Sequence, residues 1–241
     1  MQKTEIEWSD KTWNPVSGCT KISEGCKFCY AEEIAERFRG QKGFPNGFDL
    51  TIREHKLKEP LLLKKTSVIF VNSMSDCFHE GISDDYLDKM FDVMRKADWH
   101  VFQVLTKRPN RMREYFASRS VPKNVWLGVS VENQRHVDRI DVLREIKASC
   151  RFLSCEPLLS SLEMNLEGIH WVIVGGESGR TPRPIKVEWV EDIQRQCEIA
   201  GVDFFFKQWG GRNKKEAGRL LNGREWNAVP NIKDFIAEYR A

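Results

Sequence analysis

The stretch SVIFVNSMSDCFHEGISDDYLDKMFDVMRKADWHVFQVLTKRP, residues 67–109, decides the fold of this chain. Its two ends, 67–76 and 100–109, are near-continuous apolar runs of the kind found in strands buried on both faces. Between them, apolar residues recur at helical spacing behind Ser83, a favourable N-cap residue. A strand, a helix and a strand at this spacing predict a right-handed βαβ unit with parallel strands.

The same unit recurs along the rest of the chain. Further strands are predicted at VWLGVSVEN (125–133), RFLSCEP (151–157), HWVIVGGESG (170–179) and DFFFKQWGG (203–211), with TEIEW (4–8) as a possible earlier strand. These repeats predict an α/β fold, a full or partial (β/α) barrel, with an open doubly wound sheet as the alternative. We expect a single domain over 1–241, with 207–241 as a basic C-terminal extension. In both architectures the polar strand ends meet at one rim, which predicts a site for a large polar ligand there.

Composition excludes several classes of protein. The chain has 241 residues, of which 41% are hydrophobic and 30% charged, as in ordinary globular proteins. Its apolar runs are too short to span a bilayer, and MQKTEIEWSD (1–10) lacks the apolar core of a signal peptide. We therefore expect a cytoplasmic protein without membrane contact. The 38 basic residues exceed the 35 acidic ones by only three, which permits an anionic partner without demanding one.

Three of the seven cysteines cluster in WNPVSGCTKISEGCKFCYAE (13–32). Cys19, Cys26 and Cys29 lie after the possible first strand and before a predicted helix that begins near Ala31. Thiolates are soft ligands that suit zinc or iron–sulfur clusters, and a disulfide framework is not expected in a chain of this kind. A closed zinc site needs a fourth ligand, which this segment does not supply. The spacing favours an iron–sulfur cluster with one open iron, and leaves zinc with a distant ligand, or no metal, as alternatives.

These residues resemble the radical S-adenosylmethionine superfamily, in which three cysteines after the first barrel strand hold a [4Fe–4S] cluster. The closest resemblance is to a phage and prophage family named for its three-cysteine motif. It rests on 13–32 together with VNSMSDCFHE, FQVLTKRPNRM, VWLGVSVENQ, FLSCEPLL, WVIVGGESG and FFFKQWGG. It implies that Cys19, Cys26 and Cys29 ligate the cluster, with Phe28 beside the cosubstrate. It also implies reductive cleavage of S-adenosyl-L-methionine to a 5′-deoxyadenosyl radical, with a flavodoxin or ferredoxin as electron donor.

The chain departs from the superfamily pattern at two places. Six residues separate Cys19 from Cys26, where three are common. The Gly-Gly-Glu segment ending at Glu177 comes too late in the chain to bind the amino group of the cosubstrate. We therefore expect 72–76 to take that part. The predicted cosubstrate-binding residues are Ser73, Ser75 and Asp76 for the amino group, Ser130, Glu132 and Asn133 for the ribose, and Gly175 and Gly176 for close backbone approach.

The catalytic residues on the substrate side are not fixed by the sequence. Lys107 offers a cation at the rim, and Cys155 is either a hydrogen donor or a packed thiol. Glu156 and Lys207 end different strands, and they either act together at the barrel mouth or form a structural ion pair.

The segment KQWGGRNKKEAGRLLNGREW (207–226) is basic and contains two tryptophans. Cations interleaved with aromatic rings fit phosphate contacts with base stacking, which indicates a nucleic-acid or nucleotide substrate. The alternative is a solvated loop. At the level of function, two alternatives to a radical enzyme stay open: a non-catalytic zinc or iron–sulfur protein that binds nucleic acid, and a barrel that keeps its cluster for electron transfer or regulation.

Overall fold

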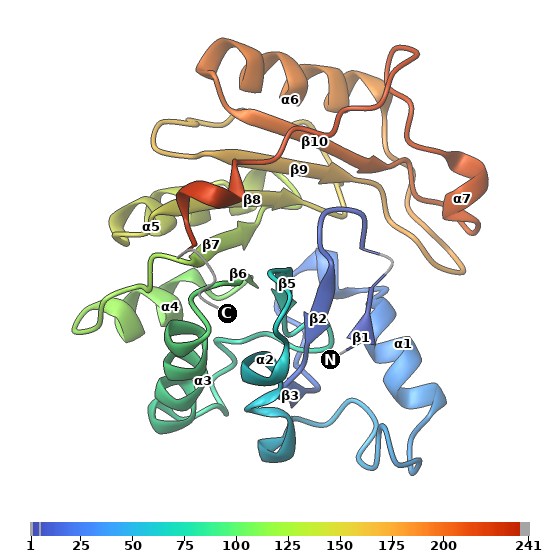
Figure 1. The fold of residues 1–241 in the computed structure, drawn as a ribbon. Coiled ribbons are helices and arrows are strands. Elements are labelled where there is room, and N and C mark those ends of the chain that lie inside the picture. The colour runs from blue at the N-terminus through green and yellow to red at the C-terminus, as the bar shows by residue number, and fades with distance from the viewer. Residues whose placement is uncertain (1, 5, 237–241) are drawn as a thin grey trace.

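Parallel strands form a sheet that curls into a half-barrel in the computed structural model, which describes residues 2–4 and 6–236 (Figure 1). The strands, in spatial order, are β2 (Lys11–Trp13), β5 (Val68–Val71), β6 (Val101–Thr106), β7 (Val125–Ser130), β8 (Cys150–Cys155), β9 (Trp171–Gly175) and β10 (Asp203–Gln208). A short β1 (Gln2–Lys3) pairs antiparallel with β2 at one edge. The order ends at β1 and β10, so the barrel is open among the described residues.

Helices cover the convex face of this sheet (Figure 1). They are α2 (Glu59–Leu62), α3 (Asp84–Lys96), α4 (Pro109–Phe116), α5 (Arg139–Glu145) and α6 (Val187–Ala200). Outside this layer lie α1 (Tyr30–Arg37), α7 (Lys214–Ala217), the pair β3 (Val16–Ser17) and β4 (Thr51–Ile52), and the 3-10 turns η1 (Glu24–Cys26), η2 (Glu54–Lys56), η3 (Gln134–His136) and η4 (Ile232–Asp234). None of the helices in the described part of the chain has the length and apolar character that a membrane span requires.

The predicted strand–helix repeats are confirmed. All six clear runs contain a strand, and the predicted helix start is present because the Ser83 hydroxyl accepts from the Tyr86 N–H at 3.3 Å. The prediction of a strand at TEIEW is wrong, since the described residues of 4–8 form no strand and β2 follows them instead. Trp8 is buried inside the half-barrel, against Phe70 at 4.8 Å between ring centroids. The apolar character of 4–8 therefore reflects a side chain that packs inside the half-barrel, and not a strand.

Aromatic side chains fill the floor of the half-barrel. Trp171 is fully buried, and its ring centroid lies 5.7–6.1 Å from the rings of Trp8, Trp126, Phe152 and Phe205. Edge-to-face pairs of this kind contribute about 0.5–1.5 kcal/mol each beyond the burial of their area. Because Trp126 and Trp171 lie near the starts of their strands, this aromatic floor leaves the carboxyl ends for polar residues.

The segment after β10 folds back along that strand. The Phe206 N–H donates to the Trp226 carbonyl at 3.0 Å, and the Ala228 N–H donates to the Phe204 carbonyl at 3.2 Å. The predicted C-terminal extension thus begins inside β10, at Lys207, and its later part covers the edge of the sheet. Its last residues, 237–241, lie outside the described part of the chain.

Candidate active site

The three-cysteine loop leaves β2 and ends at α1, at the rim where the parallel strands end. Cys19, Cys26 and Cys29 are partly exposed in this loop. The other four cysteines, which are Cys77, Cys150, Cys155 and Cys197, are buried in the core. Within the described residues, no three His, Cys, Asp or Glu side chains are arranged to hold a single metal ion. In a four-iron cluster each thiolate binds a different iron, so its sulfurs need not meet around one point.

The end of β5 holds the base of the loop. The Gly18 N–H donates to the Met74 carbonyl at 2.9 Å, and the Ser75 hydroxyl donates to the Val16 carbonyl at 3.1 Å. The Ser73 hydroxyl bonds the Asn14 side chain at 3.1–3.2 Å. Both predicted serines therefore bind the chain around the cysteine loop, and their contact with a cosubstrate stays a prediction.

Arg108, at the end of β6, holds the first cysteine. Its buried guanidinium donates to Cys19 Sγ at 3.5 Å and to the Thr20 carbonyl at 3.1 Å. The same group donates to Asp76 at 3.2 Å and to Glu80 at 2.9 Å. Burial, which is the largest effect, raises the pKa of the Cys19 thiol to about 11, while Arg108 opposes that rise.

Asp76 is surrounded by donors from the protein itself. One carboxylate oxygen accepts from the Phe78 N–H at 2.9 Å and from the Thr106 hydroxyl at 2.7 Å. The other accepts from the Lys107 N–H at 3.0 Å and from Arg108. This carboxylate joins the end of β5 to the end of β6, and a cosubstrate amino group would have to compete with four donors for it.

Glu132 follows β7 and anchors the middle of the loop. Its fully buried carboxylate accepts from the Ser23 hydroxyl and from Arg139 at 2.7 Å, and Lys107 Nζ lies 3.5 Å away. Burial by itself raises the pKa of Glu132, but the nearby charges of Lys107 and Arg139 lower it. The lowering effects together outweigh burial, so the pKa of Glu132 is below its usual range. Glu132 therefore stays ionised, and its predicted contact with a ribose remains a prediction.

Gly25 lies directly against this carboxylate. A Cβ added at Gly25 would lie 2.4 Å from Glu132 Oε1, so only glycine fits here. Gly25 therefore makes room for the Glu132 carboxylate. The neighbouring strand-end residues Ser130 and Asn133 support the same region, because the Ser130 carbonyl accepts from Arg139 at 2.7 Å and the Asn133 amide donates to Glu24 at 3.4 Å.

The ends of β8, β9 and β10 mainly contact one another. Lys207 Nζ lies 2.7 Å from Glu156 Oε1 and 2.9 Å from Oε2, which confirms that the two side chains pair. Gly175 lies beneath this pair, since its added Cβ would be 3.2 Å from the Glu156 carboxyl carbon. Gly176 accepts from the Gln208 amide at 3.0 Å through its carbonyl.

The loop after β9 is closed by Glu177. Its carboxylate accepts from the Arg183 N–H and Nε, each at 2.9 Å. Arg183 thus occupies this carboxylate, and the expectation that Glu177 does not hold the cosubstrate amino group stays a prediction. The Arg183 guanidinium also lies 5.4 Å from the centroid of Phe28, the aromatic residue between the last two cysteines.

Two residues predicted to act on the substrate have different surroundings. Cys155 is fully buried, and that burial raises the pKa of its thiol far above the usual range. This environment fits the packed thiol of the two sequence interpretations. Lys107 instead reaches the cysteine loop region through Glu132.

A cavity of about 600 Å³ opens beside the loop. It is lined by Glu24, Asn133, Gln134, Arg135, Leu159, Ser160, Arg183, Pro184 and Trp189. The Lys186 ammonium lies 5.3 Å from the centroid of the Trp189 ring. Trp189 offers a flat ring for stacking at this cavity. Arg183 pairs with Glu177 and Arg135 lies 3.2 Å from Glu24, so an anionic group would compete with these carboxylates for the two arginines.

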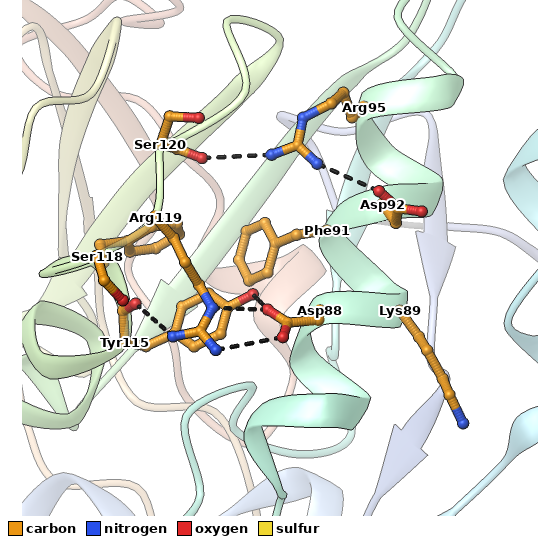
Figure 2. A pocket seen from close by; sticks show the side chains of 10 residues that line it. Asp88, Lys89, Phe91, Asp92, Arg95, Tyr115, Ser118, Arg119 and Ser120 are labelled. Atoms are coloured by element: carbon orange, nitrogen blue, oxygen red, sulfur yellow. Dashed lines mark hydrogen bonds and ion pairs between the residues drawn. The ribbon is translucent and has the colours of Figure 1, made fainter.

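A second cavity, of about 520 Å³, lies between α3 and the end of α4 (Figure 2). Arg119 Nε lies 2.7 Å from Asp88 across the crevice, while Arg95 Nη1 lies 3.3 Å from Asp92 on its own helix. Because the Arg119–Asp88 pair joins α3 to the segment that follows α4, we assign this crevice to helix packing.

The aromatic residues of 207–226 are packed against the protein. The Trp209 indole donates to the Leu220 carbonyl at 2.9 Å, and the Trp226 indole donates to the Leu221 carbonyl at 3.2 Å. Arg224 covers the Trp226 ring at 3.5 Å from its centroid. These contacts leave the predicted base stacking without support from the two rings. The side chains of Lys214 and Lys215 lie outside the described part of the structure.

Sequence reasoning missed three residues that organise the site. Arg108 directly follows Lys107 in the sequence, and only its position in the fold brings it to Cys19. Arg139 begins α5, and its place on a helix gives no sign that it is buried against Glu132. Asn72 was passed over for its polar neighbours, yet the structure leaves its buried side-chain amide without a hydrogen-bond partner.

Comparison with known proteins agrees with this architecture. The family model described as "Protein of unknown function (DUF5131)" matches residues 3–230, and the chain belongs to that family. A solved structure described as "Spore photoproduct lyase complexed with dinucleoside spore photoproduct" is similar in fold, with a TM-score of 0.53 and 10% sequence identity over 86% of this chain and 78% of that chain. This likeness confirms the predicted partial (β/α) barrel. No curated protein matches the sequence.

Proposed function

We propose that this protein is a radical S-adenosylmethionine enzyme that holds a [4Fe–4S] cluster on Cys19, Cys26 and Cys29. One observation carries the proposal: a loop with three thiols is fastened over the carboxyl ends of a parallel half-barrel by three successive strand ends. Active sites of such barrels lie at this end. The half-barrel fold shared with the lyase supports the same assignment at the level of fold.

The residues present fit a cluster and its cosubstrate. Thiolates are the usual ligands of iron–sulfur clusters, and Cys29 occupies the N-cap position of α1, where backbone N–H groups stabilise negative charge. The buried Asn72 amide offers an unused donor and acceptor. With both groups bound, the chemistry supplied is one-electron cleavage of a carbon–sulfur bond and hydrogen abstraction from a substrate.

The protein's own residues position and shield that chemistry. Arg108 donates a hydrogen bond to the Cys19 sulfur and fixes where the loop starts, and Glu132 fixes its middle through Ser23. The aromatic floor around Trp171 keeps water out from below. A flavodoxin or ferredoxin as electron donor stays part of the proposal.

A nucleic acid or nucleotide is the substrate class we favour. The cavity beside Glu24 combines Arg135, Arg183 and Trp189, which suits a phosphate attached to a flat ring. The similar lyase was solved in complex with a dinucleoside spore photoproduct, which points in the same direction. Support for this substrate class comes from the cavity, since Trp209 and Trp226 are packed internally.

The experiment is anaerobic reconstitution with iron and sulfide, followed by reduction in the presence of S-adenosyl-L-methionine. We expect charge-transfer absorbance and release of 5′-deoxyadenosine. Cys26→Ala should abolish both, whereas the matched variant Cys155→Ala, which changes a buried thiol, should keep the absorbance. Zinc in place of iron after anaerobic purification, with nucleic-acid binding retained, would favour the non-catalytic alternative. A reducible cluster that leaves the cosubstrate intact would favour electron transfer or regulation.

A further inference from the structure

Asn72 combines an unusual backbone conformation with an unsatisfied buried side chain at the rim. It has a left-handed backbone, with φ of 58°, and only 3% of its surface is exposed. Both heteroatoms of its side-chain amide lack a hydrogen-bond partner. Unsatisfied buried polar atoms cost about 1–3 kcal/mol each. A left-handed backbone is uncommon outside glycine, asparagine and aspartate. A group bound at the rim would satisfy this amide.

Its position is at the start of the cysteine loop. Asn72 directly follows β5, and its N–H donates to the carbonyl of Trp13, the last residue of β2. The Cα register places Val71 opposite both Trp13 on β2 and Val104 on β6. Asn72 thus lies at the rim between the two strands whose ends lead to Asn14 and to Arg108.

The other polar side chains of the segment 72–76 are engaged within the protein. Ser73 bonds Asn14, Ser75 donates to the Val16 carbonyl, and Asp76 accepts from four donors. Asn72 is the member of this segment whose side chain both donates and accepts and has neither capacity used.

We infer that Asn72, and not Asp76, recognises the amino-acid end of the cosubstrate. An amide presents one acceptor oxygen and one donor nitrogen side by side, which matches an adjacent ammonium and carboxylate. Asn72 Oδ1 would accept from the ammonium and Nδ2 would donate to the carboxylate. This inference rests on the proposed function, and it gives the left-handed backbone of Asn72 the role of presenting the amide.

The test is Asn72→Gly, compared with Asn222→Gly. Asn222 also has a left-handed backbone, with φ of 53°, but it is exposed. Glycine accepts this conformation without strain, so neither variant should lower the thermal midpoint of unfolding. Reconstituted Asn72→Gly should keep wild-type iron content and bind S-adenosyl-L-methionine about tenfold to 100-fold more weakly, because hydrogen bonds to charged groups are lost. Asn222→Gly should bind like the wild type.

Asn72→Asp provides the second variant. Aspartate also tolerates the left-handed region, but it replaces the donor nitrogen by an anionic oxygen that repels a carboxylate. We expect full iron content, a weakened cosubstrate affinity, and loss of the shift that cosubstrate produces in the electron paramagnetic resonance spectrum of the reduced cluster.

The outcomes separate this inference from the proposed function. Wild-type affinity in Asn72→Gly, or loss of its iron or fold, would show that the amide is structural and overturn the inference alone. A wild-type protein that carries its cluster and binds no cosubstrate would overturn both.

Discussion

The two halves of the rim use the same kinds of residue in different ways. At the ends of β5, β6 and β7, buried charged groups reach across to the cysteine loop: Arg108 to Cys19, and Glu132 to Ser23. At the ends of β8, β9 and β10, the charged groups mainly satisfy each other, as Glu156 does with Lys207. The first half therefore builds the loop's conformation, and the second half forms a wall beside it.

The difference is one of burial as well as of partners. The Glu132 side chain is fully buried, while those of Glu156 and Lys207 are 22% and 16% exposed. A fully buried charge depends on its partners, because water cannot replace them once one is removed. Water can reach the second pair and replace part of what is lost.

The largest expected effect comes from Glu132→Ala. It leaves the buried Arg139 guanidinium without its carboxylate, which should lower the free energy of unfolding of the cluster-free protein by about 3–5 kcal/mol. The matched variant Glu156→Ala should cost about 1 kcal/mol, because its partner Lys207 is partly hydrated. Denaturant unfolding of both proteins measures the contrast. Equal losses would contradict the division of the rim into two halves.

A second expectation concerns the Cys19 thiol in the cluster-free protein. Burial raises its pKa from 9.0 to about 11, so at about pH 8 its thiolate fraction should be roughly 100-fold below that of an unshifted thiol. The neutral thiol favours the folded state up to about pH 9, and this contribution is lost as the pH rises through 11. Alkylation at Cys19, followed by mass spectrometry, should be correspondingly slow and should accelerate with pH.

Two arginine variants test whether the alkylation rate of Cys19 depends on the first half of the rim. Arg108 lowers the Cys19 pKa by its charge and its hydrogen bond, so Arg108→Gln should slow alkylation further wherever the loop stays folded. Arg183→Gln, on the other half, should leave the Cys19 rate unchanged. A faster rate in Arg108→Gln would mean that Arg108 holds the loop closed more than it stabilises the thiolate.

Much of the fold could be predicted from the sequence because local signals agree with tertiary structure there. The apolar runs that became β5 to β10 are buried on both faces, and Gly201 ends α6 with φ of 65°, as its position after the helical pattern indicates. The strand β2 was missed because Lys11–Trp13 is short and carries two polar residues. Its membership in the sheet depends on pairing with β5, which no local pattern reveals.

The sequence predicts which kinds of residue form the site better than it predicts their hydrogen-bond partners. The polar residues did identify the rim, because each group of them follows directly where an apolar strand ends. Which of them bind the loop depends on three-dimensional distances, as Glu132 illustrates through Ser23, a residue 109 positions away. Residue chemistry alone made Asp76 the best candidate for an amino group; only the structure shows its four donors and the unused amide of Asn72.

The smallest expected difference is between two glycines, and it refines the comparison. A Cβ at Gly25 would lie 2.4 Å from Glu132 Oε1, a contact that real structures do not show, and the carboxylate cannot withdraw without leaving Ser23 and Arg139. A Cβ at Gly175 would lie 3.2 Å from the Glu156 carboxyl carbon, which can shift toward solvent.

Gly25→Ala should therefore cost about 1–3 kcal/mol of stability and lower the iron bound after reconstitution. Gly175→Ala should keep its iron and lose less than about 1 kcal/mol. Iron content per protein and denaturant midpoints decide the matter. If Gly175→Ala lost its iron while Gly25→Ala kept it, the second half of the rim, and not the first, would hold the loop in the shape that binds the cluster.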